Sequence, residues 1–270
     1  MRLRWIVYAY LMIGGGLFLA MLQVPLVANT TKPFAGALGL GSYGIVGAGS
    51  LVGGLLCGRL SRARTLLEPA TAALLVVCSI ALPTFIMRGT FEPLVFSGAQ
   101  LALLATVGFV CALAGAAVGN HLHGKPSQFV DAVSFVSLLA GLYYAILVLA
   151  MFIALVSEMF STIVAVPLVF VAPVIAGMFA AVLFPDRAMR TAAFGTTLIG
   201  ALLASYAVIN AIPKGPTEAL IKGIAASFFV GVVIVLSCAG AFAADKFNLT
   251  RFAEPLAPEP PIASARVTKS

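Results

Sequence analysis

The sequence predicts an all-α integral membrane protein, a bundle of about eight transmembrane helices. Of its 270 residues, 61% are hydrophobic and only 9% are charged, and the mean hydropathy is +1.11, whereas a soluble domain carries about 25% charged residues. Apolar stretches of about 20 residues, the length that crosses a hydrocarbon core about 30 Å thick, recur along the chain. No segment alternates apolar and polar residues over about 10 positions, as the strands of a membrane β-barrel do. We therefore expect lipid to surround most of the chain, and α-helices to cross it.

Polar breaks divide the apolar sequence into eight predicted helices. The first apolar run begins at Trp5 and is longer than the core of a signal peptide, about 7–15 residues, so we interpret it as an uncleaved membrane helix. The break between the fifth and sixth runs depends on Ser157 and Glu158, without which the two runs would merge into one implausibly long helix. The predicted ranges are 5–27, 35–57, 66–87, 94–118, 130–156, 161–184, 192–212 and 219–243.

The Lys and Arg residues predict which helix ends face the cytoplasm. Moving such a charge through the membrane centre costs about 2.5–3.5 kcal/mol, and short cytoplasmic loops carry an excess of them. With eight helices, twelve basic residues fall on one side and four on the other. We therefore expect both termini in the cytoplasm, in a bacterial cytoplasmic (inner) membrane. The twelve are Arg2, Arg4, Arg59, Arg62, Arg64, Lys125, Arg187, Arg190, Lys246, Arg251, Arg266 and Lys269; the four are Lys32, Arg88, Lys214 and Lys222.

Similar sequences near the ends of the even-numbered helices predict four consecutive helical hairpins of about 62 residues each. Each of these sequences is a step of two small residues separated by three others, followed by polar residues, and the steps begin 61, 62 and 63 residues apart. Two membrane helices with short loops also occupy about 60 residues without any repeat. The period therefore has two interpretations, a true duplication or ordinary spacing. The steps begin at Gly54, Gly115, Gly177 and Gly240.

The composition changes near residue 254, which predicts two regions. Residues 1–253 contain all the apolar runs and form the predicted transmembrane helical domain. Residues 254–270 are rich in Pro and polar residues and have no apolar period. Such a segment cannot bury enough apolar surface to fold, so we expect a disordered cytoplasmic tail.

Residues suited to catalysis are missing from the apolar runs. Covalent catalysis needs a nucleophile with a base within hydrogen-bond reach, and no predicted helix carries a His or Lys at membrane depth. The carboxylates lie at predicted helix ends, where water or the helix dipole stabilises them. We therefore predict no catalytic residue and no enzyme. The four carboxylates considered are Glu68, Asp131, Glu158 and Asp186.

The sequence also gives no clear sign of a metal, a cofactor or nucleic acid. His121 and His123 lie together in one loop, and even with Asp131 they form only a weak metal signal. A haem between helices needs a ligand at depth, commonly His. The basic residues separate apolar runs and do not form a patch with interleaved aromatic residues, as nucleic-acid binding requires. We predict no metal, no cofactor and no nucleic-acid partner.

Glycines in the second predicted helix indicate close helix packing. Gly49 and Gly53, and likewise Gly54 and Gly58, are four residues apart, so each pair forms a groove that a neighbouring backbone can enter. The helix is expected inside the bundle or against another subunit. The predicted packing glycines are Gly49, Gly53, Gly54, Gly58, Gly115, Gly119, Gly177 and Gly240.

Two tyrosines indicate a candidate polar site near the middle of the membrane. Tyr143 and Tyr144 lie at the centre of the fifth predicted helix, away from the interfaces where Tyr is usually found. A buried phenol needs a hydrogen-bond partner, and the candidates are Gln100, Ser134, Ser137 and Asn210.

Helix-breaking residues add to this candidate site. Pro167 and Pro173 in the sixth predicted helix remove backbone donors, and transporters use interrupted helices of this kind to present carbonyls to a solute. A run of three glycines, Gly14–Gly16, is a second candidate break. Simple kinks are the alternative interpretation. The full candidate site comprises Tyr143, Tyr144, Pro167, Pro173, Gln100 and Asn210.

Two functional hypotheses remain. In the first, the chain is a non-catalytic subunit or scaffold of a membrane complex, which the small-residue helix faces and the lack of buried charge favour. In the second, it is a permease or channel for a neutral or lipid-like small solute, which the prolines and central tyrosines favour. A buried acid for ion coupling is missing from the sequence. The expected partners are the lipid bilayer and other membrane subunits or a second copy of the chain.

Overall fold

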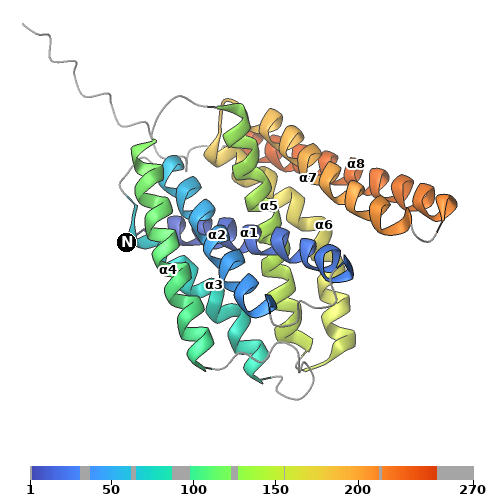
Figure 1. Ribbon diagram of the computed structural model, residues 1–270. Coiled ribbons are helices and arrows are strands. Elements are labelled where there is room, and N and C mark those ends of the chain that lie inside the picture. The colour runs from blue at the N-terminus through green and yellow to red at the C-terminus, as the bar shows by residue number, and fades with distance from the viewer. Residues whose placement is uncertain are drawn as a thin grey trace, which may run out of the picture.

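The structure, a computed structural model, describes residues 2–30, 37–61, 65–86, 98–122, 127–154, 156–212 and 215–247. Within these ranges the side chains of residues 20–30, 37–42, 80, 83–86, 98, 158, 206 and 210 are not described. The predicted tail, 254–270, lies outside the described residues. Every secondary-structure element in the described part is an α-helix (Figure 1): α1 (Leu3–Thr30), α2 (Ala37–Leu60), α3 (Leu67–Ile86), α4 (Gly98–His121), α5 (Gln128–Ala154), α6 (Glu158–Leu183), α7 (Ala188–Ala211) and α8 (Pro216–Lys246).

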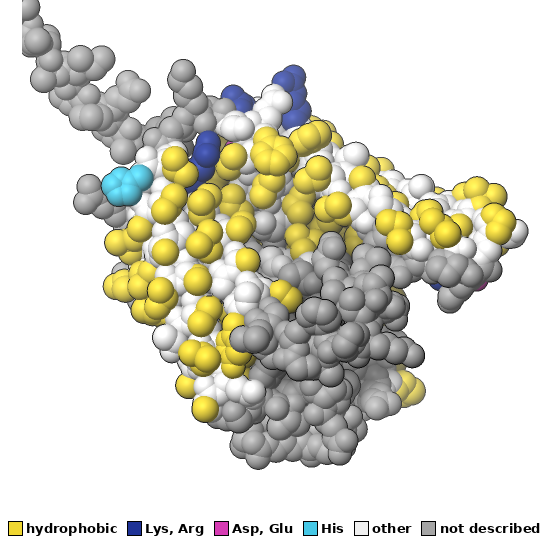
Figure 2. All heavy atoms as spheres, in the orientation of Figure 1, with side chains coloured by type: hydrophobic (Ala, Val, Ile, Leu, Met, Phe, Trp, Pro, Cys, Tyr) yellow, Lys and Arg dark blue, Asp and Glu magenta, His cyan; other side chains and the backbone are white. Residues whose placement is uncertain are grey.

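Six of these helices are long and apolar enough to cross a membrane, namely α2, α4, α5, α6, α7 and α8. In α1 and α3 the described apolar stretches are shorter, Leu3–Leu19 and Leu67–Ser79. Hydrophobic side chains cover much of the flank visible in Figure 2, and the Lys and Arg side chains in that view gather at one end. The predicted all-helical class is confirmed, with six helices that could span a membrane.

Most helix ends lie within a few residues of their predicted positions. The largest differences, of four residues, are at the starts of α4 and α7, and α8 extends three residues beyond its predicted range at each end. A helix continues into polar sequence because its backbone hydrogen bonds do not need apolar side chains, and in α8 Glu218 and Lys222 add an ion pair of 3.2 Å one turn apart. The predicted break between the fifth and sixth helices also has a local cause, since the Ser157 hydroxyl caps α6 by accepting a hydrogen bond from the Phe160 amide.

Helix α6 is continuous through both of its prolines. Pro167 lies on the exposed side of the helix, whereas Pro173 is buried. Each proline removes one backbone donor but leaves the rest of the ladder intact. The sixth helix is therefore not interrupted in the way that a carrier's discontinuous helix is.

The eight helices pack as two groups of four, joined by α1 and α5. Consecutive helices of each predicted hairpin do contact one another, but α2 packs most extensively on α4, and α6 packs on α8 as well as on α5. One hydrophobic core lies among α1 to α4 and includes Tyr144 and Leu138 of α5, and the second lies among α5 to α8. Helix α5 therefore contributes to both cores. Figure 1 shows α7 and α8 side by side, extending beyond the other helices at their loop end.

Glycines allow the paired helices of each group to touch at the backbone. A Cβ atom on Gly54 or Gly58 of α2 would collide with a backbone carbonyl of α4, and one on Gly115 or Gly119 would collide with a carbonyl of α2. The same contact joins α6 and α8, where Gly177 meets the Ser237 carbonyl and Gly240 meets the Val174 carbonyl. Approach this close is possible only without a side chain.

Candidate functional site

The most polar contact in the described interior surrounds Tyr144 at the junction of α1, α3 and α5. The side chain is 1% exposed. Its hydroxyl lies 3.1 Å from the Val76 carbonyl oxygen and 2.9 Å from the Ser79 hydroxyl, which itself lies 2.8 Å from the same carbonyl. Whichever hydroxyl donates to the other, both hydrogens find acceptors. The phenol is thus satisfied inside the bundle, as a buried polar group must be to avoid a large penalty.

Gly14–Gly16, a candidate break in the sequence, allows α1 to pack closely on two neighbouring helices, α5 and α2. Successive helical residues point about 100° apart, and here Gly14 and Gly15 face α5 whereas Gly16 faces α2. A Cβ on Gly14 would lie 2.6 Å from the Tyr144 ring, one on Gly16 would lie 3.1 Å from the Gly49 Cα, and one on Gly15 would collide with the Ser137 carbonyl. The run does not interrupt α1, which is continuous here.

The junction of α1 and α5 is closed by aromatic rings as well as by backbone contact. We call the set Tyr10, Phe18, Tyr143 and Tyr144 the aromatic seam. The Tyr10 and Tyr144 ring centroids are 6.0 Å apart, and those of Phe18 and Tyr143 are 6.2 Å apart. Both distances fall within the range of favourable aromatic pairs. The seam therefore fills the space between the two four-helix groups.

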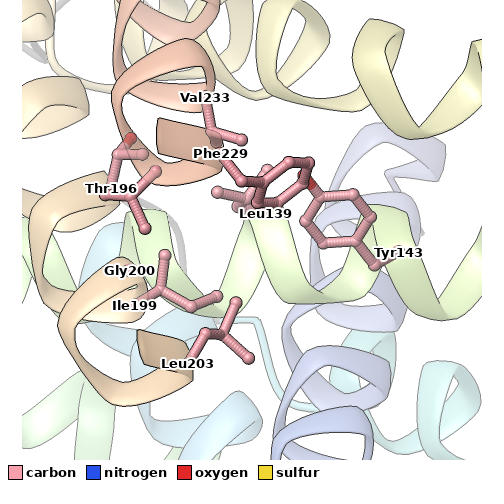
Figure 3. Close-up of a pocket in the computed structure, with 9 residues that line it drawn as sticks. Leu139, Tyr143, Thr196, Ile199, Gly200, Leu203, Phe229 and Val233 are labelled. Atoms are coloured by element: carbon pink, nitrogen blue, oxygen red, sulfur yellow. The ribbon is translucent and has the colours of Figure 1, made fainter. Parts of the chain in front are cut away.

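Tyr143 lies beside a small niche between α5, α7 and α8 (Figure 3). Its hydroxyl is buried and has no hydrogen-bond partner among the described residues, and its ring points toward Phe229 in Figure 3. The niche has a volume of about 10 Å³, which is about the minimum for one water molecule. Its walls are Leu139, Tyr143, Thr196, Ile199, Gly200, Leu203, Phe229, Val230 and Val233.

The niche offers no second polar group to a ligand. The hydroxyl of Thr196 is its one other polar side chain, and it donates to the Ala192 carbonyl of its own helix at 2.6 Å. The accessible walls of the niche are apolar, so a solute that entered here would meet neither hydroxyl. The geometry fits a packing defect with one unsatisfied phenol better than a built binding site.

The described side chains that the sequence offered as partners of the tyrosines are not the ones that bond Tyr144. Gln100 is exposed at the start of α4, and the side chain of Asn210 lies outside the description. Ser134 donates to the Val130 carbonyl of its own helix at 2.7 Å. The partner of Tyr144 is Ser79, a residue that sequence reasoning did not consider, because nothing in its local pattern connects it to the fifth helix.

The predicted packing glycines of α2 all lie in the interior. Gly49, Gly53, Gly54 and Gly58 are buried, but their surroundings differ. A Cβ on Gly53 would lie 2.9 Å from the Ile13 backbone nitrogen, whereas one on Gly49 would have no neighbour closer than 3.5 Å. Gly53 therefore leaves no room for a Cβ atom, whereas Gly49 has room for one in ordinary van der Waals contact.

Asp131, Arg187, Arg2 and Glu68 make their polar contacts at helix ends. Asp131, at the start of α5, is 7% exposed and lies 3.9 Å from Arg187. The backbone amide of Arg2 donates to the Glu68 carboxylate at 3.2 Å. The Arg187 side chain is 40% exposed, so its ion pair contributes little to stability. These contacts lie at helix ends, where the sequence analysis expected the acids to be.

The described residues contain no cluster of three or more His, Cys, Asp or Glu that could hold a metal ion. His121 is exposed at the end of α4 and His123 lies outside the description. Away from the bundle end that holds Asp131 and Glu68, the buried polar side chains of the described interior are hydroxyls, which can donate and accept hydrogen bonds. In comparisons with known proteins, no family model, no characterised protein and no solved structure matches this chain.

Proposed function

We propose that this chain is a non-catalytic subunit or scaffold of a membrane complex. The observation that carries the proposal is the closure of the aromatic seam, in which Tyr144 is 1% exposed and hydrogen bonded to Val76 and Ser79. A solute path would need a polar cavity at this depth. The niche beside Tyr143 has room for about one water molecule, so the described interior supports a packed structural role.

The proposal includes eight membrane crossings. Helix α1 has 28 residues and α3 has 20, and at 1.5 Å per residue these correspond to roughly 42 Å and 30 Å. Both lengths reach across a hydrocarbon core about 30 Å thick. An even number of crossings places both termini on the same side.

The proposal also places the end with Arg59, Asp131 and Arg187 in the cytoplasm. Asp131 lies close to the Arg187 side chain and within electrostatic reach of Arg59. The positive-inside bias of membrane proteins favours the cytoplasm for an end with this many basic residues. A bacterial cytoplasmic membrane is the proposed location.

The test is the composition of the protein extracted from its native membrane in a mild detergent. A subunit should remain in a complex of defined stoichiometry through two different chromatographic steps, and native mass spectrometry should give a mass well above the 27.8 kDa of the chain. A Gly54→Leu variant, whose own packing is disrupted, serves as a control for nonspecific association. A single species of 27.8 kDa would contradict the proposal.

A permease for a neutral or lipid-like solute is the second candidate, and one observation favours it. The Tyr143 hydroxyl is buried near the middle of α5 without a partner. An unsatisfied buried hydroxyl costs about 1–3 kcal/mol, and a solute could offset that cost. This candidate requires the niche to enlarge, because its present volume of about 10 Å³ is too small for a solute.

A further inference from the structure

The contact between α1 and α5 is reciprocal. A Cβ on Gly15 would collide with the carbonyl of Ser137, and a Cβ on Gly141 would collide with the carbonyl of Leu11. Gly141 stands 126 positions after Gly15, and Ser137 stands 126 positions after Leu11. If each residue of α1 is replaced by the residue 126 positions later in α5, and each residue of α5 by the one 126 positions earlier in α1, the first contact becomes the second. Such reciprocity defines an interface between two copies of the same surface.

The contacts inside the two four-helix groups obey similar offsets. Gly54 of α2 meets the Ala112 carbonyl of α4, and Gly177 of α6 meets the Ser237 carbonyl of α8. Gly177 stands 123 positions after Gly54, and Ser237 stands 125 positions after Ala112. The same helix faces therefore meet at the same backbone atoms in both groups.

The return contact between the same helices repeats as well. Gly115 of α4 meets the Leu51 carbonyl of α2, and Gly240 of α8 meets the Val174 carbonyl of α6. Gly240 stands 125 positions after Gly115, and Val174 stands 123 positions after Leu51, which are the same two offsets as before. Each helix of the first half is therefore separated from its equivalent in the second half by one constant offset: 126 positions from α1 to α5, 123 from α2 to α6 and 125 from α4 to α8. The offsets differ from one helix to the next because the loops between helices differ in length, as loops most readily do.

Ordinary spacing of membrane helices does not produce this agreement. Regular spans would give similar helix lengths, but would not place a glycine of each helix against the same carbonyl of the same partner in both halves. Two glycine contacts inside the first half match two inside the second, and the two contacts between α1 and α5 match each other. The two halves therefore share the same helix-to-helix contacts and not only the same spacing. The unit that repeats is a group of four helices, which is twice the predicted hairpin.

We infer that the chain consists of two copies of one four-helix module, residues 2–122 and 127–247, and that the α1–α5 contact is the surface by which one module binds another copy of itself. The inference rests on the eight crossings proposed above, because four crossings per module give both copies the same orientation, but it does not rest on the scaffold role. A chain that runs alone in detergent would contradict the scaffold and leave the modules in place.

Two circular permutants of the full chain should differ in stability if the modules exist. In the first permutant, the chain begins at Ser127, continues through Ser270 to Met1 and ends at Leu122, so that both modules stay intact and only their order changes. In the second, the chain begins at Thr65 and ends at Ser61, which divides the first module around the second. Both keep all eight helices and omit only residues between two of them, 123–126 in the first permutant and 62–64 in the second, and both keep an even number of crossings on each side of the junction.

Thermal unfolding in detergent, followed with a thiol-reactive fluorophore, gives the readout. Cys57 is buried and reacts only on unfolding, whereas Cys78, which is exposed, and Cys111 and Cys238, which are partly exposed, are replaced by Ala to remove background. We expect the first permutant to elute as a monodisperse species and to melt within about 5 °C of the parent. The second permutant should either aggregate or show a decrease in melting temperature, relative to the parent, that is at least twice the decrease shown by the first.

Matched substitutions in the unpermuted chain provide a second, independent measurement. Gly15→Ala and Gly141→Ala occupy equivalent positions and meet equivalent carbonyls, so their melting temperatures should fall by amounts that agree within about 2 °C. Equal melting of the two permutants, loss of both, or better folding of the second permutant would each overturn the module boundary. Unequal effects of the two alanines would overturn the reciprocal interface.

Discussion

The hydroxyl oxygen of Tyr144 lies 2.9 Å from that of Ser79, which is 65 residues earlier in the chain. The contact joins α5 to α3 and thereby ties the second four-helix group to the core of the first. Because Gly14 leaves room for the phenol ring, three helices meet at one side chain. Polar contacts of this kind fix the relative position of helices that lipid alone does not drive together.

Removing the Tyr144 hydroxyl should destabilise the protein, and removing the adjacent one should not. Tyr144→Phe deletes a satisfied hydrogen bond and should lower the free energy of unfolding by about 1 kcal/mol. Tyr143→Phe deletes a hydroxyl that has no partner among the described residues, so stability should stay the same or rise. Thermal unfolding in detergent measures both. A larger loss in Tyr143→Phe than in Tyr144→Phe would reject this description of the seam.

Leucine substitutions on α2 should destabilise the protein at a glycine that touches a neighbouring backbone, and should not do so at a glycine on the free surface of the helix. Gly54→Leu places a side chain against the Ala112 carbonyl and should cost about 1–3 kcal/mol or more of stability. Gly44→Leu is the matched control, because a Cβ at Gly44 has no neighbour within 4 Å. In the second group Gly177→Leu and Gly231→Leu form the corresponding pair. Melting temperatures that do not distinguish Gly54→Leu from Gly44→Leu would show that α2 does not pack on α4.

The topology can be tested by cysteine labelling in a Cys-free background. Cysteines at Ser127 and Asp186 should react with a membrane-impermeant reagent only from the cytoplasmic side, and cysteines at Thr31, Thr90 and Pro216 only from the other. Ser61 lies at the Ser127 end but is buried, which makes it a poor reporter. Phe170→Cys, on the exposed flank of α6, should stay unlabelled from either side. Reaction of Thr31 and Ser127 from the same side would refute eight crossings.

The fold class could be predicted from the sequence because it depends on local composition. Apolar runs determine where a helix crosses lipid, and Ser157 ends one run by capping the next helix, so the order of helices follows from short stretches of sequence. Helix ends were less accurate where the helix extends beyond its apolar part, as in α8. The approximate length of each helix could be predicted for the same reason.

The candidate site was only partly readable, because its contacts are distant in sequence. Tyr143 and Tyr144 were recognisable as unusual, but their different surroundings depend on which neighbour each faces, and Ser79 had no pattern that connected it to them. The glycine run at Gly14–Gly16 has the composition of a helix break, and its actual role depends on three partners that only the packed structure brings together.

The paired groups were also hard to predict from the sequence. The period of about 62 residues found in the sequence is half of the structural repeat. A step of small residues marks every even-numbered helix, but only the packed structure shows that α2 pairs with α4 and α6 with α8. A pattern in one helix does not identify the helix that it contacts.

The most direct test of the central claim is solute flux through the purified wild-type protein. Proteoliposomes at matched protein density should shrink and reswell, in gradients of urea, glycerol or a short diol, at the rate of protein-free liposomes, because the aromatic seam is closed and the niche has a volume of about 10 Å³. A Tyr144→Ala variant, which opens the seam, serves as a control for sensitivity to leakage. Flux through the wild type that exceeds the liposome background and falls in Tyr143→Phe would contradict the structural role and identify a permease.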